Sequence, residues 1–103
     1  MTLLKMRLDL FLKASRLMLR RALAQEFCDA GLVKVNDLKA KSSREIKPDD
    51  EIEITRRRRI LKIRVLQIPK SKQVSRAEAA NLYEIISEES LDDDFVEGKI
   101  INE

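Results

Sequence analysis

The 103-residue chain contains no histidine, one cysteine and two glycines. The missing histidine excludes every catalytic triad and metal site that needs an imidazole. The lone Cys28 cannot form a thiolate metal cluster or an intramolecular disulfide, and two glycines are too few for a phosphate-binding glycine loop. We therefore predict that the protein is not an enzyme and holds no cofactor and no metal.

Long hydrophobic runs are also missing. No stretch of about 18 apolar residues is present, which argues against a membrane-spanning helix. The start MTLLKM does not resemble a secretory signal, so we expect a cytoplasmic protein. Because Cys28 follows Phe27 within a helical pattern, we expect it to be a small buried residue rather than a reactive thiol.

The charge is unevenly divided along a chain that is long enough for one domain. Residues 1–76 hold 20 Lys and Arg against 9 Asp and Glu, a net charge of +11, whereas residues 77–103 hold 1 against 9, a net charge of −8. This asymmetry is typical of a polyanion-binding body with an acidic extension. A solvated, charge-rich surface is the alternative.

The spacing of apolar residues predicts two helices at the start of the chain. The first covers residues 7–17, with Asp9 on its polar side, and the second covers residues 20–30, where Gly31 supplies the left-handed residue that ends it. The expected buried stripes are Leu8, Phe11, Leu12 and Ser15 in the first helix and Leu19, Leu23, Phe27 and Ala30 in the second.

After Gly31 the hydrophobic period changes from 3.6 to 2, which predicts strands. Asn36-Asp37 and Pro48-Asp49-Asp50 are typical turn sequences. Leu66 and Ile68 fall out of phase, which indicates a bulge or a strand end near Pro69. The expected strands are residues 33–35, residues 38–41, a segment with Ile52 and Ile54 inward and, longest of all, residues 60–68.

A capping box, Ser75 followed by Glu78, predicts a third helix. We expect it to pack through Ala79, Leu82, Tyr83 and Ile86. The predicted organisation is an α+β body over residues 1–69, a basic linker and C-terminal helix over residues 70–90, and an acidic tail over residues 91–103. The tail can compete with a polyanion or point towards a basic partner, and we favour the second role.

The basic residues of the two helices and the first hairpin predict a phosphate-binding surface. Arginine forks bind phosphate in a bidentate manner, and the start of a helix favours anions. The candidate RNA-binding residues are Arg7, Lys13, Arg16, Arg20, Arg21, Lys34, Lys39, Lys41, Ser42, Ser43 and Arg44.

These residues lie in motifs that resemble the RNA-binding domain first described in small-subunit ribosomal protein four, the S4 domain. The motifs RLDLFLKASRLMLRRALAQEF, VKVND, AKSS and KPDDEIEI follow one another in the order and spacing of that family, over about residues 6–68. The resemblance implies an αL-type fold, in which two helices pack on a small bent antiparallel sheet and RNA lies on the helical pair. Arg7, Arg16 and Arg21 match arginines of the family motif.

Four positions depart from the family pattern. Leu10 replaces a usual lysine, Leu19 takes a place where a lysine or a capping threonine is common, and Asp37 and Asp49 replace turn glycines. Asp enters the left-handed region more easily than most residues, so the turns remain possible. The four arginines at residues 56–59 can compensate for the lost cations, although a solvated hairpin tip is the alternative.

The ending AEAANLYEIISEES is similar to the bacterial RqcP family of ribosome-associated quality-control factors, and more distantly to the Hsp-fifteen heat-shock proteins. The resemblance implies a protein that binds ribosomal RNA and tRNA on large subunits carrying peptidyl-tRNA, together with a factor that adds C-terminal tails to stalled chains. We expect it to be a monomer. Two alternatives remain open, namely Hsp-fifteen-like recycling of stalled subunits and a protein-interaction module with vestigial RNA binding.

Overall fold

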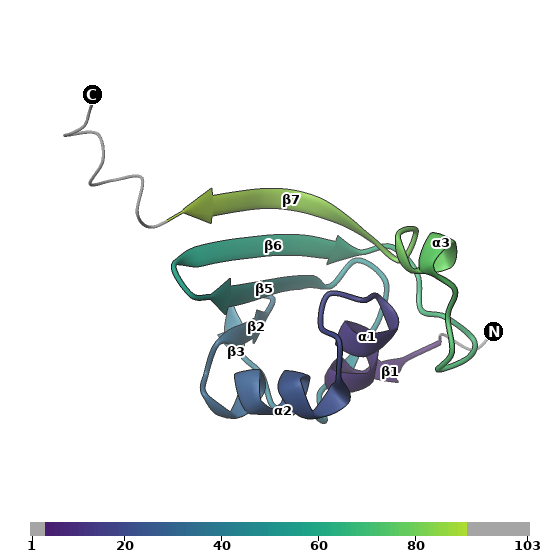
Figure 1. Cartoon of the computed structure of the whole chain (residues 1–103), viewed down its shortest axis with the longest axis horizontal. Helices are drawn as coiled ribbons and strands as arrows, with labels where there is room; N and C mark the ends of the chain where they lie inside the picture. Colours follow the sequence, from purple (N-terminus) through teal and green to yellow (C-terminus); the bar gives the residue numbers. More distant parts are fainter. Residues whose placement is uncertain (1–3, 91–103) are drawn as a thin grey trace.

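The computed structural model describes residues 4–90 (Figure 1). Within these residues, three helices accompany seven strands. No helix in this part of the chain is both long and apolar enough to cross a membrane. The elements are β1 (Met6–Arg7), α1 (Leu8–Ala14), α2 (Arg21–Asp29), β2 (Val33–Val35), β3 (Leu38–Lys39), β4 (Glu45–Ile46), β5 (Glu51–Arg56), β6 (Arg59–Val65), α3 (Arg76–Ala79) and β7 (Tyr83–Ser90).

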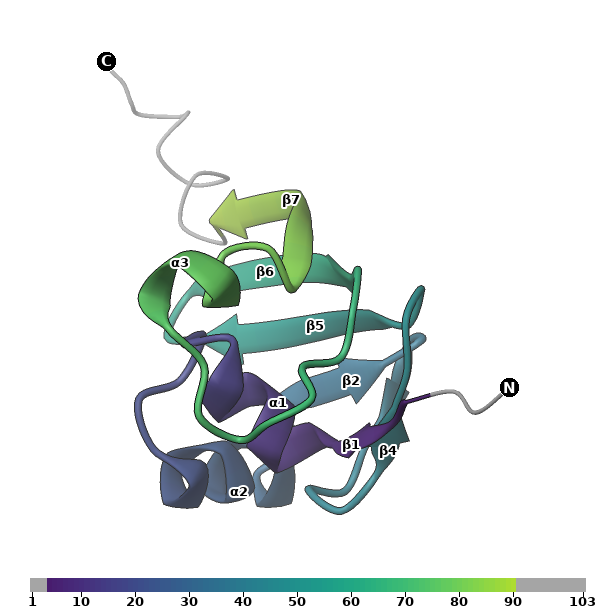
Figure 2. The ribbon, with the colours of Figure 1, turned by 90° about the vertical axis from the view of Figure 1, so that its right-hand side faces the viewer.

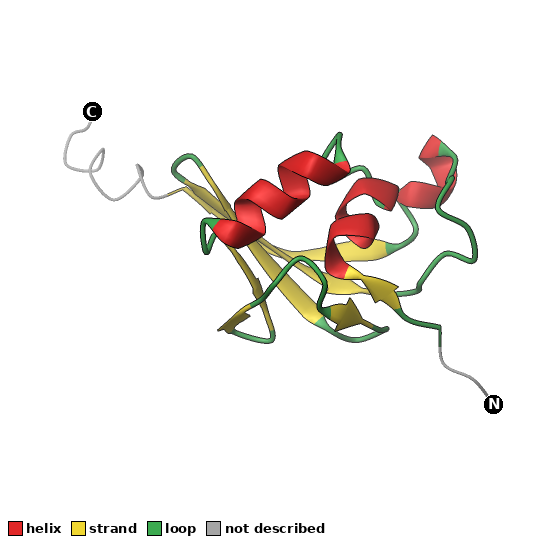
Figure 3. Cartoon of the chain, turned by 90° about the horizontal axis from the view of Figure 1, so that it is seen from below, coloured by secondary structure: helices red, strands yellow, loops and turns green. Residues whose placement is uncertain are grey.

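The main sheet has five antiparallel strands in the order β3-β2-β5-β6-β7. β5 and β6 form its central hairpin, and β7 arches along the outer side of β6 (Figure 1). The helices lie on one side of this sheet (Figure 3). The α+β class, with two N-terminal helices packed on an antiparallel sheet, is therefore confirmed.

One hydrophobic core joins the helices to the sheet. Ile52 and Ile54 of β5 point inward as predicted, because alternate residues of a strand face opposite sides. Leu8, Phe11 and Leu12 of α1 are fully buried against the same cluster. The lone Cys28 is buried, as expected. Its burial, together with the nearby charges of Asp9 and Asp29, raises the pKa of the thiol to about 11, so it stays protonated at neutral pH.

The first helix is shorter than predicted because Arg16 adopts a left-handed conformation, with φ of 64°. Ser15 is the last residue with helical geometry. The amide of Arg16 then donates to the carbonyl of Lys13 over 3.0 Å, which is the inner bond of a Schellman motif, and the amide of Met18 donates to the carbonyl of Leu12 over 3.0 Å. Residues 16 and 17 therefore belong to the loop rather than to the helix.

The predicted buried stripe of the second helix is partly wrong. Leu19 precedes the helix and is 82% exposed, while Ala24 and Cys28 carry the buried face. Leu23 and Phe27 are half-buried, and Ala30 is exposed. The helix is rotated about its axis relative to the predicted orientation, because Arg21 and Gln25, one turn apart, both donate to the carboxylate of Asp9 on α1.

The third helix is one turn long, so the predicted C-terminal helix is wrong beyond its start. The cap itself is present, because the amide of Glu78 donates to the hydroxyl of Ser75 over 3.1 Å. From Tyr83 the chain is extended as β7, which satisfies the open edge of β6. The amide of Leu66 donates to the carbonyl of Leu82 over 2.8 Å where the two segments meet.

The prediction that residues 60–68 form the longest strand is wrong. β6 has 7 residues and ends at Val65, so the out-of-phase Leu66 lies beyond the strand. β7 has 8 residues and is the longer strand. The register shifts between Lys62 and Ile63, which leaves Ile86 of β7 as the extra residue of a bulge.

Two short strands, β1 and β4, were not predicted from the sequence. β1 and β4 form a two-stranded sheet in which Met6 lies opposite Ile46 and Arg7 opposite Glu45. Each strand has 2 residues, which is too short to produce a hydrophobic period. Their pairing depends on the fold between them.

The turn predictions are confirmed. Asn36 and Asp37 have φ of 51° and 70° in the hairpin between β2 and β3, and Asp49 has φ of 79°. The carbonyl of Lys47 accepts from the amide of Asp50 over 3.2 Å, so Pro48 and Asp49 are the central residues of this turn. Aspartate thus occupies two positions that favour glycine.

We expect Asp49→Gly to stabilise the protein by up to about 1 kcal/mol, because glycine adopts a positive φ without the penalty that a Cβ carries. Urea unfolding measures the change. The matched control is Asp29→Gly within the right-handed α2, which should destabilise the protein by a few tenths of a kcal/mol. A destabilising Asp49→Gly would show that its side chain matters more than the backbone strain.

Candidate nucleic-acid interface

The buried carboxylate of Asp9 organises the junction of the two helices. Its side chain is 0% exposed. Arg7 donates to it in a bidentate manner, from Nε to Oδ1 over 3.1 Å and from Nη2 to Oδ2 over 3.0 Å. From α2, Arg21 Nε donates over 3.2 Å and Gln25 Nε2 over 2.9 Å, both to Oδ2. Four donors therefore surround one carboxylate, although the sequence placed Asp9 on a polar, solvated side.

The charge of Asp9 is maintained by these donors. Burial alone would raise the pKa of the carboxyl group, but the hydrogen bonds from Arg7, Gln25 and Arg21 outweigh burial and lower the pKa to about 2. An ionised carboxylate in this position is tolerated because it is paired and hydrogen-bonded. Arg7 and Arg21 are thereby held at fixed positions on either side of it.

The two guanidinium groups keep donors for an external anion. Arg21 contacts Asp9 through Nε alone, so its two terminal nitrogens form no hydrogen bond with the other described residues. Arg7 retains Nη1 in the same way. Both side chains remain about two-fifths exposed, at 43% and 41%. We call Arg7, Arg16 and Arg21 the arginine corner.

Arg16, the third of these arginines, lies in the loop between the helices, after the C-terminal end of α1. Its guanidinium donates from Nη2 to the carbonyl of Val74 over 3.0 Å, which ties the loop to the segment before α3. That segment passes in front of α1 in Figure 2. Lys13 and Lys72 line a pocket of about 270 Å³ beside Arg16. Lys72 was not among the predicted site residues, although the basic composition of residues 70–72 was the available signal.

The segment from Lys41 to Arg44 approaches the arginine corner at the start of α1. The amide of Leu8 donates to the carbonyl of Arg44 over 2.7 Å, and the amide of Asp9 donates to the carbonyl of Ser42 over 3.1 Å. These contacts satisfy free donors at the helix start. Lys41, Ser43 and Arg44 are exposed there and Ser42 is half-buried, so the predicted serines and cations of this segment lie beside the corner.

Three other predicted residues are placed differently. Arg20 is exposed and flanks the corner as the residue before α2. Lys34 and Lys39 lie opposite each other on β2 and β3, at the far edge of the main sheet. The side chain of Lys39 passes close to Gly31, 3.4 Å from the position of a Cβ. Lys34 and Lys39 therefore form an extension of the basic surface rather than part of its centre.

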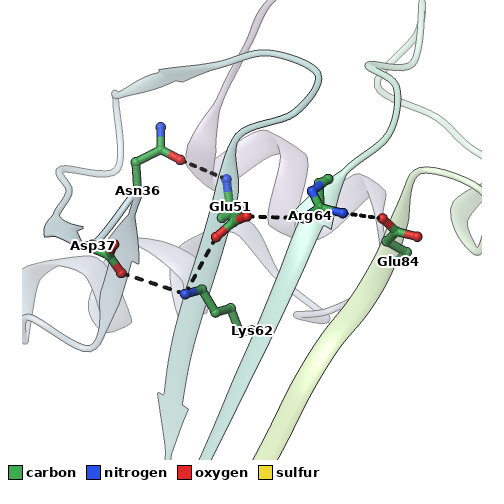
Figure 4. Close-up of polar contacts among 6 residues, drawn as sticks. All are labelled: Asn36, Asp37, Glu51, Lys62, Arg64 and Glu84. Carbon is green, nitrogen blue, oxygen red and sulfur yellow. Dashed lines mark hydrogen bonds and ion pairs between the residues drawn. The ribbon is translucent and has the colours of Figure 1, made fainter.

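The outer face of the sheet is charged but paired (Figure 4). Arg64 lies between two carboxylates, 2.7 Å from Glu84 and 3.3 Å from Glu51. These hydrogen bonds, first from Glu84 and then from Glu51, raise the pKa of Arg64. Lys62 similarly lies 3.5 Å from Glu51 and 3.8 Å from Asp37. The basic side chains Lys62 and Arg64 of this face are therefore paired with carboxylates, whereas Arg7 and Arg21 keep unpaired guanidinium nitrogens.

The fold and this basic surface agree with the comparisons to known proteins. Residues 6–52 match the family model of the S4 domain, so the chain is an S4-domain protein. It is 45% identical over 83 residues to the RQC P-site tRNA stabilizing factor of Streptococcus pneumoniae, covering 81% of this chain and 92% of that one. The Bacillus subtilis factor is 41% identical over 86 residues, covering 84% and 98%. The chain belongs to this family, the RqcP factors.

Two solved structures have the same fold. The trimeric Heat Shock Protein 15 of Vibrio cholerae superposes with a TM-score of 0.73 at 26% identity, covering 82% of this chain and 84% of that one. A hypothetical protein, HP1423, superposes with a TM-score of 0.70 at 36% identity, covering 82% of this chain and all of the other, 100%. The resemblance inferred from the sequence motifs is confirmed.

Acid should weaken the fold through Asp9. Because the folded-state pKa of about 2 lies below the ordinary value of 3.8, the stabilisation is fully present above about pH 4 and is lost as the pH falls towards 2. The shift corresponds to about 2 kcal/mol of unfolding free energy. Urea unfolding at pH 5, 4, 3 and 2 measures it. Stability that does not fall over this range would contradict the role given to Asp9.

We expect Asp9→Asn to destabilise the protein by about 2 to 4 kcal/mol, because one partner is removed from a buried charge cluster. It should also weaken RNA binding although it makes the chain more positive, since Arg7 and Arg21 lose their fixed positions. Unfolding and RNA titration are both measured, with binding compared at a temperature where the variant is folded. Asp29→Asn, at an exposed position, is the charge-matched control. Equal RNA binding by the two variants would contradict the role of Asp9 in positioning Arg7 and Arg21.

Proposed function

We propose that this chain is an RNA-binding factor that docks on the large ribosomal subunit carrying peptidyl-tRNA, during quality control of stalled translation. The arginine corner supplies its main phosphate contacts, and Lys13, Arg20 and the Lys41–Arg44 segment extend them. The factor acts in the cytoplasm by binding and positioning RNA, not by catalysing a reaction. Its partners are ribosomal RNA, tRNA and a factor that tails the stalled nascent chain.

The observation that carries this proposal is the shared carboxylate beneath the corner. Asp9 holds Arg7 and Arg21, which come from β1 and α2, with donors still open to solvent. Preorganised guanidinium groups lose less entropy when they bind phosphate and present a bidentate fork. The relatives support the kind of RNA, since the RQC P-site tRNA stabilizing factors share up to 45% identity with this chain among those compared.

A second function is favoured by one observation. The likeness to Heat Shock Protein 15, with a TM-score of 0.73, supports recycling of stalled large subunits as an alternative to stabilising their tRNA. The two functions differ in outcome. A stabilising factor increases the amount of peptidyl-tRNA retained on the large subunit when it is added, whereas a recycling factor lowers it.

Ribosome binding tests the arginine corner. Arg16→Ala should weaken co-sedimentation with large subunits that carry peptidyl-tRNA, and should lower the slope of log K against log salt by about 0.7 to 0.9, the value for one lost phosphate contact. Arg16 is the cleanest choice because it contacts a carbonyl rather than the buried carboxylate. For Arg21 the charge-conserving Arg21→Lys removes the fork and should also weaken binding.

Arg57→Ala at the tip of the β5-β6 hairpin is the matched control, since it removes the same charge from an exposed residue of positive φ. It should cost less affinity than Arg16→Ala at the same salt concentration. A larger loss with Arg57→Ala would place the RNA elsewhere. The full chain must be used, because a chain that ends near residue 70 lacks β7 and leaves the edge of β6 unpaired.

A further inference from the structure

A groove at the tip of the central hairpin is separate from the arginine corner. It has a volume of about 360 Å³ and lies where the β5-β6 hairpin meets the loop between α1 and α2. Its apolar lining comes from Leu17, Ile54 and Leu61, and its cationic lining comes from Arg56, Arg57 and Arg59. We call this site the hairpin groove. An apolar floor with a cationic rim suits a segment that is both acidic and hydrophobic.

The cations of the groove outnumber its acidic residues, because Glu88 is the one carboxylate among the described residues that line it. Arg57 and Arg59 form no ion pair with a carboxylate of residues 4–90. Arg56 lies over the ring of Phe27, 5.7 Å from its centre, which orients its guanidinium without supplying a negative charge. Three guanidinium groups thus face solvent beside an apolar surface.

β7 brings one acidic segment directly to this groove. Its last residue, Ser90, lies opposite Arg59, and Glu88 lies opposite Leu61 and lines the groove itself. The chain continues from Ser90 as LDDDFVE, residues 91–97. Five residues span at most about 17 Å, so Asp92–Asp94 and Phe95 are within reach of a groove whose rim includes the partner of Ser90.

We propose that the hairpin groove is the docking site of the chain's own segment 91–97. Asp92–Asp94 match the three guanidinium groups in number and sign, and Phe95 and Val96 match the apolar floor. This docking needs no second molecule, and tethering gives the segment a high effective concentration at the groove. The sequence-based expectation favoured a tail that points to a separate basic partner, because exposed ion pairs are weak and a folded-back tail would offset the attraction of the body for RNA. β7 instead runs back along the hairpin and brings the acidic segment to the groove.

The docked segment would limit where RNA can bind. With its arginines neutralised, the hairpin attracts phosphate less than the arginine corner does, because three carboxylates cancel its local charge. RNA contacts are then confined to the corner and its neighbouring loop. The small effect expected for Arg57→Ala follows from the same arrangement, but the docking itself does not depend on RNA.

Nuclear magnetic resonance of the full chain without RNA tests the docking. Asp92→Asn, Asp93→Asn and Asp94→Asn are combined in one variant, and the arginine Nε–Hε signals of the groove are compared with those of the parent chain. The signals of Arg56, Arg57 and Arg59 should shift, and those of Arg7 and Arg21 should stay unchanged. Phe95→Ala should shift the methyl signals of the apolar floor, which are given by Leu17, Ile54 and Leu61.

The matched control combines Glu26→Gln, Asp29→Asn and Glu45→Gln, which changes the net charge equally at exposed positions. Groove signals that move no more in the tail variant than in this control would overturn the proposal. The same holds if they respond only to added RNA, because the groove would then be an RNA surface. In the parent chain, 0.5 M salt should move the groove signals towards the positions that they have in the tail variant, because salt screens the ionic contacts of a docked tail.

Discussion

The ionised, buried carboxylate of Asp9 is the interaction on which the rest of the structure depends. It joins β1, α1 and α2 through Arg7, Arg21 and Gln25. A single unpaired charge at this depth would cost several kcal/mol. The two helices can therefore pack in this way only when Arg7 and Arg21 donate hydrogen bonds to the carboxylate of Asp9. The same constraint leaves their remaining guanidinium nitrogens without a partner among the described residues, and these nitrogens are the ones proposed to bind phosphate.

A second buried carboxylate has a related role on the sheet. Asp50 is 3% exposed and accepts from the amide and the ammonium group of Lys47 and from the side chain of Asn36. Burial opposes ionisation, but these donors lower the pKa of Asp50. Asn36 in turn accepts from the amide of Glu51 over 3.0 Å (Figure 4). The two strained turns are therefore joined by polar contacts that compensate their positive φ angles.

Charge is arranged by region rather than spread evenly. On the outer face of the sheet, Lys62 and Arg64 are paired with carboxylates of neighbouring strands, and such exposed pairs contribute about 0 to 1 kcal/mol each. Their main effect is to keep that face close to neutral. The arginine corner and the hairpin groove keep unpaired donors, and these are the two places where we propose that RNA and the acidic end of the chain bind.

Much of the fold could be read from the sequence, because the necessary signals are local. The apolar spacing of Leu8, Phe11 and Leu12 predicts a helix, the alternation through Ile52 and Ile54 predicts a strand, and Gly31 marks the end of α2 with its positive φ of 76°. The S4 motifs likewise predicted the basic surface as a set of residues. They did not separate those at its centre from those at its edge.

What only the tertiary structure decided depends on contacts between distant residues. The segment from Tyr83 to Ser90 has an apolar spacing that fits a helix, yet it forms β7 because the open edge of β6 offers a full ladder of hydrogen bonds. Asp9 looks like a surface residue until Arg21 and Gln25 arrive from another helix. Local periodicity reports which residues prefer burial, whereas the pairing of edges and buried charges is settled only when the chain closes on itself, because the partners are far apart in sequence.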